Sequence, residues 1–386
     1  MTIENPLRIL IVVSFANLAG AQIAAVRLAR GLRDRGHDPK VIFLYEQRPV
    51  DGADHPYEVV VPKAKPGAAG YLRMGFDLAK IIKREQPDVV LTFLPLANVL
   101  GQAVARLSGI RCRIVSHRMP VNTASPLLRR MDLAWAFLGL YTGVVAVSES
   151  VKLTCRKYPE WLLKKTVVVH NGLRDFHPSK LTHEEARRRF DVPEGKTALV
   201  AVGRFAKQKN YPFLLSLMPR LDNVLLLIAG DGPLRPELEQ QIRDLGIEDK
   251  VRLLGAVHRD DVPDLLAAAD IFVQTSLYEG QSNSVLEALQ AGVPIVAHDI
   301  AEQRETIEGE NGMLAGALVP LNDVNAWVKA IEGLRASPEA VTGAHENALR
   351  QAAMFTYDRM ISGFEHVLRT AVAPVREEIS PESKPA

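Results

Sequence analysis

The sequence has little cysteine: Cys112 and Cys155 are the only two among 386 residues. Two cysteines are too few for a disulfide framework or a cysteine-rich metal site. Their scarcity is typical of a reducing compartment, so we expect a cytoplasmic location. The N-terminus carries Glu4 and Pro6 before its first apolar run, and it does not resemble a signal peptide.

The sequence also lacks an uncharged run long enough to cross a membrane. Val89–Ala105 and Leu133–Ser148 come nearest, but Pro95 interrupts the first, and Gly139 and Gly143 lie in the second. Both are shorter than the roughly 20 residues that a spanning helix needs. We interpret each as a helix and a buried strand that follow one another, and we expect no transmembrane segment.

The composition is that of a globular protein, with 47% apolar and 24% charged residues. A chain of 386 residues exceeds one ordinary core, so we expect two domains. The net charge of +2 conceals an asymmetry. Residues 1–180 carry 26 Lys and Arg against 14 Asp and Glu, and the remainder carries 21 against 31. The basic first half predicts an anionic partner: a nucleic acid, an anionic membrane surface or a phosphate-bearing substrate.

Several basic side chains of the first half are candidates for that contact: Lys63, Lys65, Arg73, Lys80, Lys83, Arg84, Arg129 and Arg130. Scattered solvated charge is the simpler explanation for most of them. Because no recognition motif accompanies them, nucleic-acid binding has the weakest support, and we expect no nucleic-acid partner.

Continuous apolar runs alternate with helical patterns along the chain. Arg8–Val13 is expected to be a strand, and a small-residue loop leads to a helical pattern over Ala21–Arg35. Further strands are expected at 41–44, 59–61, 89–93, 113–116 and 143–147. The pattern restarts after residue 190, with strands expected at 198–202, 224–229, 251–254, 271–273 and 295–297. Two successive βα arrays with non-alternating apolar strands predict two doubly wound α/β domains with buried parallel sheets.

Two strand ends in the second half carry residues suited to a ligand. The loop Gly203–Asn210 follows the strand expected at 198–202, and ligands bind at the carboxyl ends of parallel strands. Arg204 and Lys209 in this loop suit a diphosphate, Arg as a fork and Lys as a point charge. The turn Gly230–Pro233 allows close approach of backbone to a ligand. The alternatives are a surface loop with ordinary charges and a plain turn.

The third strand end is the segment Tyr278–Glu287, which places Glu279 and Glu287 eight residues apart. Ser284-x-x-Glu287 matches a capping box, and it predicts the start of a helix. A helix N-terminus after a strand offers free N–H groups and a positive dipole end, which suit a diphosphate. The alternative is that Glu287 only completes the capping box and Glu279 is a solvated loop charge.

Together these motifs resemble the retaining glycosyltransferases of family 4, which have the GT-B fold of two Rossmann-like domains facing a cleft. The resemblance covers most of the chain, and the Glu-x7-Glu element is fairly specific in this context. It rests on these segments: Leu18–Gln22, Leu28–Leu32, Val147–Glu149, Asn171–Gly172, Gly203–Asn210, Glu279–Glu287 and Glu310–Gly312.

The resemblance implies transfer of a hexosyl-type sugar from a UDP- or GDP-type nucleotide-sugar donor, with retention of anomeric configuration. The acceptor would bind an N-terminal domain over 1–175, and the donor a C-terminal domain over 176–355. We expect a closing helix over 356–373 that returns to the N-terminal domain, and a disordered, proline- and charge-rich tail over 374–386.

The resemblance also assigns roles to residues. Arg204 and Lys209 would neutralise the charge that develops on the leaving diphosphate. Glu279 would hold the sugar, and His117, after the strand at 113–116, would contact it; the alternative for His117 is an ordinary loop residue. Glu287 would bind the ribose. The donor-binding residues implied are Gly20, Gly203, Val257, Gly280, Gln281, Ser282, Asn283, Ser284, Val285 and Glu287, with Gly20 near the diphosphate and backbone near Val257 receiving the base.

The family mechanism is described as a front-face reaction in which the leaving phosphate takes the acceptor's proton, so we assign no dedicated base. No Asp-x-Asp occurs in the sequence, which agrees with a metal-independent enzyme that has no cofactor. Two positions depart from the family. Ala19 stands where many relatives have glycine, which affects how the first loop fits the diphosphate. Gln281 stands beside the sugar site where relatives often have an apolar residue, so the identity of the donor cannot be inferred from any of them.

The sequence therefore predicts a cytoplasmic glycosyltransferase of polysaccharide biosynthesis that acts on a glycan or a lipid-linked saccharide. The basic first half and the patch Leu127–Met131 motivate a hypothesis of peripheral contact with the inner face of an anionic membrane, where each Lys or Arg adds about 1 kcal/mol. The alternatives are a GT-B nucleotide-sugar epimerase or phosphorylase, and a nucleotide-sugar-binding module without turnover.

Overall fold

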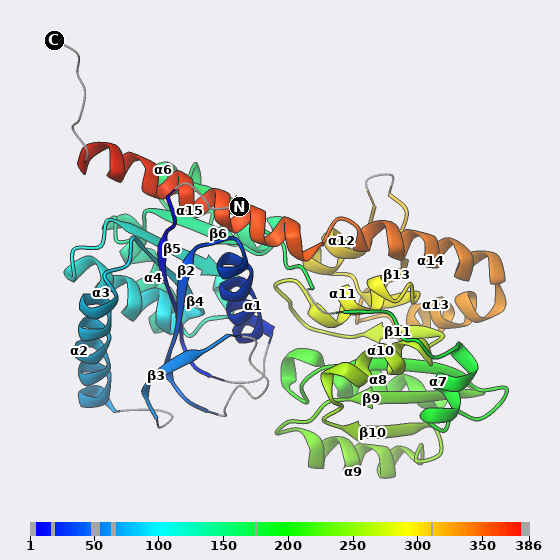
Figure 1. Cartoon of the computed structure of the whole chain (residues 1–386). Coiled ribbons are helices and arrows are strands. Elements are labelled where there is room, and N and C mark those ends of the chain that lie inside the picture. Colours follow the sequence, from blue (N-terminus) through cyan, green and yellow to red (C-terminus); the bar gives the residue numbers. More distant parts are fainter. Residues whose placement is uncertain are drawn as a thin grey trace. The chain divides into compact units, whose positions relative to one another are not determined.

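The computed structural model describes residues 5–16, 20–47, 55–62, 67–173, 176–309 and 312–379. The chain divides into a first unit, Met1–Asn171 with Tyr357–Ala386, and a second unit, Gly172–Thr356. Each unit is an α/β domain built on one sheet (Figure 1). These residues singled out from the sequence lie outside the described residues: Glu4, Leu18, Ala19, Lys63, Lys65, Glu310 and Asn311, as does the end of the expected tail, residues 380–386.

The sheet of the first unit is parallel throughout its described strands, which lie in the order β3-β2-β1-β4-β5-β6-β7. The chain proceeds from β1 to β2 and β3 on one side and then returns to β4 on the other. The strand order therefore reverses between β1 and β4. The strands are β1 (Arg8–Val13), β2 (Asp38–Tyr45), β3 (Tyr57–Val61), β4 (Val89–Phe93), β5 (Cys112–His117), β6 (Gly143–Ala146) and β7 (Thr166–Val168).

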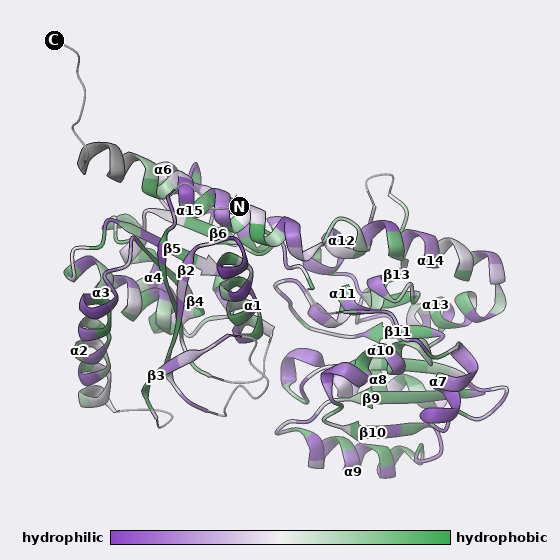
Figure 2. Cartoon of the chain, viewed as in Figure 1, coloured by the Kyte–Doolittle hydropathy of each residue, from purple (hydrophilic) through white to green (hydrophobic). Residues whose placement is uncertain are grey.

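Helices cover both faces of this sheet because alternate residues of a buried strand point to opposite sides. Ile9 and Ile11 of β1 share one core with α1 and α15, whereas Leu10 and Val12 share another with α2 and α3. Figure 2 colours these elements by the hydropathy of their residues. The described helical segments are α1 (Gly20–Asp34), α2 (Ala68–Glu85), the π-helical turn η1 (Ala97–Gly101), α3 (Gln102–Leu107), the 3-10 turn η2 (Val121–Thr123), α4 (Pro126–Phe137), α5 (Glu149–Thr154), α6 (Glu160–Leu163) and α15 (Tyr357–Ile379).

Helix α15 returns to the first unit, as predicted for the closing helix, and it packs against α1. Gly31 of α1 permits this approach, since a Cβ at that position would lie 2.5 Å from the Ile361 side chain. The Tyr357 hydroxyl donates to the Arg27 carbonyl at 2.9 Å. Arg35 Nη1 lies 2.9 Å from Glu365 Oε2, which adds an ion pair at the rim of this apolar contact.

The disordered tail was expected to begin at residue 374, but helix α15 continues through residues 374–379. Three of these six residues are Arg or Glu, which have good helix propensity, whereas Pro374 is unfavourable in a helix interior. The preceding turns are fixed by buried Phe364 and Leu368, so adding a further turn requires no new nucleation.

The second unit also has a parallel sheet, and its described strands lie in the order β10-β9-β8-β11-β12-β13. The order reverses between β8 and β11. The strands are β8 (Thr197–Val202), β9 (Val224–Ala229), β10 (Val251–Gly255), β11 (Ile271–Gln274), β12 (Ile295–His298) and β13 (Gly316–Val319). Leu199 and Ala201 of β8 enter one core, and Ala198 and Val200 enter the core on the other face.

The helices of the second unit alternate with its strands, as the sequence predicts for a doubly wound domain. The described segments are α7 (His183–Arg189), η3 (Lys207–Lys209), α8 (Tyr211–Leu217), η4 (Met218–Arg220), α9 (Arg235–Leu245), η5 (Arg259–Asp261), α10 (Val262–Ala267), α11 (Asn283–Gln290), α12 (Ala301–Ile307), α13 (Val324–Ala336) and α14 (Pro338–Ala352), where η3, η4 and η5 are 3-10 turns.

The two uncharged stretches of the sequence are resolved into separate elements. Val89–Ala105 comprises β4, η1 and the start of α3, and Leu133–Ser148 comprises the end of α4 and β6. No helix in the described part of the chain is long and apolar enough to cross a membrane. Cys112 and Cys155 are both buried, and neither forms a disulfide in the described part of the chain.

Candidate functional site

The loops after β8 and β11 meet at the point where the strand order of the second unit reverses. β8 and β11 are hydrogen-bonded neighbours, but their chains lead to opposite sides of the sheet. Loops that leave in opposite directions open a crevice at the carboxyl ends of such strands, and ligands of doubly wound domains bind there. The predicted residues Gly203–Lys209 and Glu279–Ser282 lie in these two loops.

An ion pair joins the two loops. Lys209 Nζ lies 2.9 Å from Glu279 Oε1, and both side chains are largely buried, with exposed fractions of 15% and 7%. Gln208 Nε2 donates to the other carboxylate oxygen of Glu279 at 3.2 Å. Leu277 N donates to the Gln208 carbonyl at 2.8 Å, so backbone contacts reinforce the pairing. The two residues assigned to the sugar and the diphosphate are therefore held together.

Gln274, at the end of β11, connects this pair to helix α11. Its Nε2 donates to Glu279 Oε1 at 3.3 Å, and its Oε1 accepts from the hydroxyls of Ser282 and Ser284, each at 3.1 Å. One amide thus links the carboxylate and both serines, so a connected set of hydrogen bonds holds the loop between β11 and α11.

The capping box predicted at Ser284-x-x-Glu287 is wrong. Helix α11 begins at Asn283, and its N-cap is Ser282. The Ser282 and Ser284 hydroxyls are engaged by Gln274 and by each other rather than by the first N–H groups of the helix. The amino end of α11 therefore keeps N–H groups and a positive dipole end for a ligand. Glu287 lies half-buried in the second turn of the helix.

Two glycines in the turn after β9 are needed for loop packing. A Cβ at Gly230 would lie 2.0 Å from the Gly203 carbonyl oxygen, and one at Gly232 would lie 2.5 Å from the Phe205 carbonyl oxygen. Phe205 N donates to the Asp231 carbonyl at 3.0 Å. The turn at 230–233 therefore supports the loop after β8, which places Arg204, an exposed cation, and Lys209. In the structure these two glycines approach the backbone of the loop after β8. That the turn also approaches a ligand, as expected from the sequence, stays a prediction.

The remaining predicted residues of the second unit occupy the same edge of the sheet. Val257 lies half-buried after β10, two strands from β8. Glu302, which follows β12, was not predicted. Burial raises the pKa of Glu302, and repulsion from Glu279 adds to this effect, so the two carboxylates lie within electrostatic range of each other.

In the first unit His117 is the last residue of β5 and is buried. Its Nε2 lies 2.8 Å from the Tyr158 hydroxyl, and that hydroxyl donates to Asp132 Oδ2. Tyr141 donates to Asp132 Oδ1 at 3.0 Å. Since the single hydroxyl proton of Tyr158 goes to Asp132, His117 Nε2 must carry the proton it shares with Tyr158. Nδ1 of the neutral ring is then an acceptor.

Burial controls the charge state of this network. It lowers the pKa of His117, an effect that Asp132 partly offsets, so the ring is neutral near pH 7. Burial and the Asp132 carboxylate raise the pKa values of Tyr141 and Tyr158, which keep their protons. A neutral imidazole whose Nδ1 carries no proton can accept a hydrogen bond from a hydroxyl group, such as that of a sugar.

Gly20 opens helix α1 after β1, and His117 ends β5 at the same edge of the first sheet, with β4 between their strands. The predicted site residues therefore fall into two sets: Gly20 and His117 in the first unit, and the others in the second. In each unit the set lies at the carboxyl edge of a parallel sheet.

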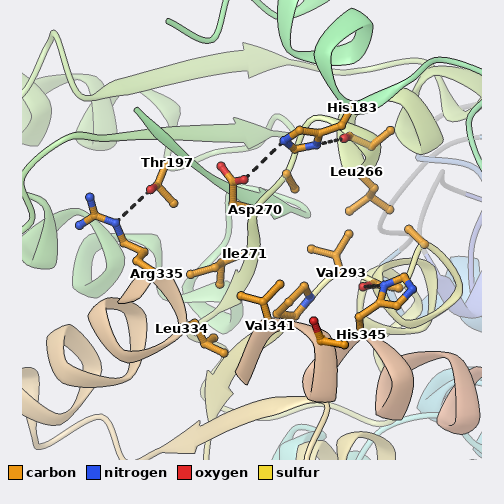
Figure 3. Close-up of a pocket in the computed structure, with 16 residues that line it drawn as sticks. His183, Thr197, Leu266, Asp270, Ile271, Val293, Leu334, Arg335, Val341 and His345 are labelled. Carbon is orange, nitrogen blue, oxygen red and sulfur yellow. Dashed lines mark hydrogen bonds and ion pairs between the residues drawn. The ribbon is translucent and has the colours of Figure 1, made fainter. Parts of the chain in front are cut away.

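A hollow of about 520 Å³ lies at the opposite edge of the second unit. It is lined where β8, β11 and β12 begin, by residues that include Thr197, Ile271 and Pro294 (Figure 3). Its polar side chains have protein partners: Arg335 Nε donates to the Thr197 hydroxyl at 3.0 Å, and His183 Nδ1 lies 2.8 Å from the Ala267 carbonyl. Because ligands of this fold bind at the other edge, we do not assign substrate to this hollow.

Sequence reasoning missed several polar residues of the two sites. Gln274 ends an apolar strand, and a polar residue there was the available signal. Asp132 is the only carboxylate of a helical stretch that also carries Arg129 and Arg130, and sequence reasoning passed over it although such a residue can have a buried hydrogen-bonded role. Among the described residues no group of three or more His, Cys, Asp or Glu side chains lies close enough to hold a metal ion.

Comparisons with known proteins agree with this geometry. The family model described as "Glycosyltransferase Family 4" matches residues 18–175, and that described as "Glycosyl transferases group 1" matches residues 182–351. The lipopolysaccharide core biosynthesis glycosyltransferase LpsE of Rhizobium meliloti (strain 1021) is 33% identical over 346 residues, which are 82% of this chain and 86% of that protein.

A second relative is the UDP-Gal:alpha-D-GlcNAc-diphosphoundecaprenol alpha-1,3-galactosyltransferase of Escherichia coli, 26% identical over 310 residues and 76% of each chain. Among solved structures, Anabaena Alr3699/HepE in complex with UDP-glucose superposes with a TM-score of 0.80 at 18% identity, over 94% of this chain and 99% of that one. Two parallel-sheet domains and these similarities establish the GT-B fold. The chain belongs to the glycosyltransferases of group 1 and family 4.

Proposed function

We propose that this glycosyltransferase moves a sugar from a UDP- or GDP-type nucleotide sugar to a glycan or lipid-linked saccharide, with retention of anomeric configuration. The observation that carries the proposal is the Lys209–Glu279 pair beside the amino end of α11, at the reversal point of the second sheet. Two relatives support it, as their names state: one uses UDP-Gal with a diphosphoundecaprenol-linked acceptor, and the other acts in lipopolysaccharide core biosynthesis.

The donor diphosphate would bind between Arg204, Lys209 and the N–H groups that begin α11. These groups carry positive charge where the leaving diphosphate gains negative charge, which is transition-state stabilisation. The loop Gly280–Val285 would enclose the sugar together with Glu279. Glu287, one turn into α11, would accept hydrogen bonds from the ribose hydroxyls, and backbone near Val257 would receive the base.

The chemical step needs a single exchange of bonds at the anomeric carbon. The acceptor hydroxyl oxygen bonds to this carbon on the face from which the diphosphate leaves, while the bond from carbon to phosphate oxygen breaks. The acceptor's proton passes to the departing phosphate oxygen. Retention follows because both events occur on one face, and no side chain is required as a base.

In the first unit His117 and Gly20 would complete the substrate contacts. The bare Nδ1 of His117 would accept a hydrogen bond from a sugar hydroxyl, and its Nε2–H is fixed by Tyr158. Gly20 would let the amino end of α1 approach the diphosphate. We also propose that the reaction requires no metal ion: full activity after dialysis against EDTA would agree, and restoration of lost activity by Mg²⁺ or Mn²⁺ would contradict it.

Calorimetry on the purified full chain tests the donor assignment. We expect one nucleoside diphosphate from a panel to bind, and Lys209→Met to weaken its binding. Product detection after adding the matching nucleotide sugar and an acceptor separates the rival activities. A new glycoside identifies a transferase; an isomerised nucleotide sugar, a sugar phosphate or no turnover would instead support an epimerase, a phosphorylase or a binding module.

A further part of the proposal is peripheral contact with an anionic membrane. Helix α2 exposes Leu72 and Phe76, and helix α4 exposes Leu127 beside Arg129 and Arg130. Apolar and basic side chains together suit the interface of an anionic bilayer. These exposed residues of the two helices support the hypothesis of an acceptor presented by a lipid.

Vesicle co-sedimentation tests the membrane contact. We expect binding to vesicles containing phosphatidylglycerol at low salt, and weaker binding to phosphatidylcholine alone. Arg129→Glu with Arg130→Glu should reduce binding, and Arg188→Glu with Arg243→Glu, two exposed arginines of the second unit, should not. Absence of vesicle binding at low salt, or an equal loss of binding in both double variants, would contradict the proposed membrane contact.

A further inference from the structure

Two buried arginines lie near the two ends of β5, and they differ in how their charges are accommodated. Arg113, near the start of the strand, is 7% exposed, and Arg118, just beyond its end, is 6% exposed. Arg113 donates to four backbone carbonyls, those of Ile110, Arg111, Gly139 and Leu140, at 2.5 to 3.0 Å. Four of the five N–H groups of this guanidinium thus have acceptors, which gives it a structural role.

Arg118 has far fewer partners. Its Nη2 donates to the Asn171 side-chain oxygen, and its guanidinium carbon lies 5.6 Å from the centre of the Phe93 ring. The Nε and Nη1 atoms are buried and have no hydrogen-bond partner among the described residues. No carboxylate in the described part of the chain forms an ion pair with it, and burial lowers the pKa of Arg118 to about 9.

A buried cation without an anion is unfavourable, because the charge loses its hydration and gains nothing equivalent. Proteins keep such groups where a ligand supplies the missing charge. Asp132 faces the same hollow but is already hydrogen-bonded to Tyr141 and Tyr158. The protein as described therefore leaves the charge of Arg118 uncompensated.

The surroundings of Arg118 form a small polar hollow at the carboxyl end of β5. Ser116, His117, Arg118 and Asp132 line it, and the buried hydroxyl of Ser116 also has no partner among the described residues. Its accessible volume is about 30 Å³, room for an oxygen atom or two of a ligand rather than for a whole sugar. Ser116 and Arg118, which carry the unpartnered donors, thus both line one hollow at the ligand edge of the sheet.

We propose that Arg118 binds a phosphate oxygen of a substrate, and that it is an anion contact of the first unit beside His117. The proposal rests on the proposed function for the identity of the substrate. The phosphate can belong to the nucleotide of the donor or to a phosphate-linked acceptor, and the chemistry of the contact is the same in both.

Stability measurements separate a ligand-binding arginine from a structural one. Arg118→Met in the full chain replaces an uncompensated buried cation by an apolar side chain of similar length, so we expect the melting temperature to rise by about 2 °C or more. Arg113→Met is the matched control. It removes the donor for four carbonyls and should lower the melting temperature by at least as much.

Titrations with different ligands identify which substrate supplies the phosphate. Wild type and Arg118→Met are titrated with inorganic diphosphate, UDP, GDP, a sugar joined by diphosphate to a ten-carbon chain, and its methyl glycoside. We expect the Arg118→Met variant to lose at least 10-fold in affinity for the lipid-linked diphosphate or for the nucleoside diphosphates, and to bind the methyl glycoside unchanged. Arg118→Lys should restore part of the loss.

The outcomes are distinct from those of the proposed function. A raised melting temperature with a loss of phosphate affinity supports the proposal even where no sugar transfer is detected. A fall in melting temperature like that of Arg113→Met would show that Arg118 is structural. A raised melting temperature with unchanged affinity for every phosphate probe would show that water satisfies its donors, and either result would overturn the proposal.

Discussion

Lys209 and Glu279 form an ion pair in which both side chains are nearly buried. Gln274 and Gln208 also donate hydrogen bonds to the Glu279 carboxylate. The pair is therefore prepared for ligand binding before the donor arrives, which reduces reorganisation in the reaction.

We predict that Lys209→Met lowers kcat by about 10²- to 10³-fold, the usual cost of one preorganised group that stabilises transition-state charge. Steady-state kinetics with the donor found by calorimetry measures it. Lys207→Met is the control, since Lys207 is exposed on the same 3-10 turn and should change kcat less than about 2-fold. Equal effects of both substitutions would exclude a specific role for Lys209.

The hydrogen bonds around Asp132 allow a matched test of His117. Tyr158→Phe and Tyr141→Phe each remove one hydroxyl from Asp132, but only Tyr158 also contacts His117. Both variants should lose a similar amount of stability, about 1 to 3 kcal/mol. Only Tyr158→Phe should lower kcat/KM, by about 10-fold, because the ring loses the group that fixes its tautomer. Equal kinetic losses would show that Asp132, not His117, matters for activity.

Among the elements, α15 is the one that closes the first unit. Phe364 is fully buried in this helix, and its ring stacks on Phe93 of β4 with 6.1 Å between centres. The core between β1, α1 and α15 therefore depends on a segment that is remote in sequence. Truncation before residue 357 would expose this apolar face.

Phe364→Ala should destabilise the first unit by about 3 to 5 kcal/mol, the usual cost of a large cavity. Phe137→Ala at the exposed end of α4 is the control and should change stability by less than about 0.5 kcal/mol. Urea unfolding followed by circular dichroism gives both values. A small effect of Phe364→Ala would mean that α15 contributes little to the core.

Helix α11 shows how local sequence rules and tertiary structure compete. The Ser-x-x-Glu pattern favours a capping box, but Gln274 provides a better buried acceptor for both serine hydroxyls. The start of the helix is therefore set by a residue at the end of β11, nine positions before Asn283, which a local pattern does not include.

At the scale of the whole molecule, pH should act chiefly on the first unit. Burial is the main cause that lowers the pKa values of His37, His55 and His117. The unfolded chain then binds more protons than the folded one as pH falls below about 6.5, so stability is lost in that direction. Burial alone would raise the pKa of Glu365, but hydrogen bonds from Arg35, His37 and Arg369 outweigh it and lower it to about 2.

Scanning calorimetry from pH 8 to pH 3.5 tests these signs. The melting temperature should be highest above about pH 7, fall between pH 6.5 and 5 as the histidines take up protons, and fall further below about pH 4.5. Glu365→Gln should remove part of the last decrease. A melting temperature that rises as the solution is acidified would contradict the histidine assignment.

Much of the fold could be predicted from the sequence because its strands are apolar runs between helical patterns. The strand expected at 224–229 is β9, and the closing helix returns to the first unit. The short edge strands β7 and β13 were missed, since Thr166–Val168 and Gly316–Val319 are too brief to show a pattern. They are fixed by pairing with β6 and β12.

The sequence predicted the residues at each strand end of the site, but not the contacts between different strand ends. The sequence places Lys209 and Glu279 in separate loops, and their ion pair depends on the adjacency of β8 and β11. The surroundings of His117 depend on α4 and on the segment after α5, which contribute Asp132 and Tyr158. Contacts made across the sheet carry no local signal in the sequence.

The measurement that tests the central claim most directly is time-resolved NMR of the full chain with a panel of UDP- and GDP-sugars and a lipid-diphosphate-linked saccharide. We predict that one donor yields a glycoside whose first detected anomer has the configuration of the donor, and that Glu279→Gln and Lys209→Met nearly abolish its formation. A product of inverted configuration, or undiminished product from both variants, would contradict the claim that these loops form the donor site of a retaining glycosyltransferase.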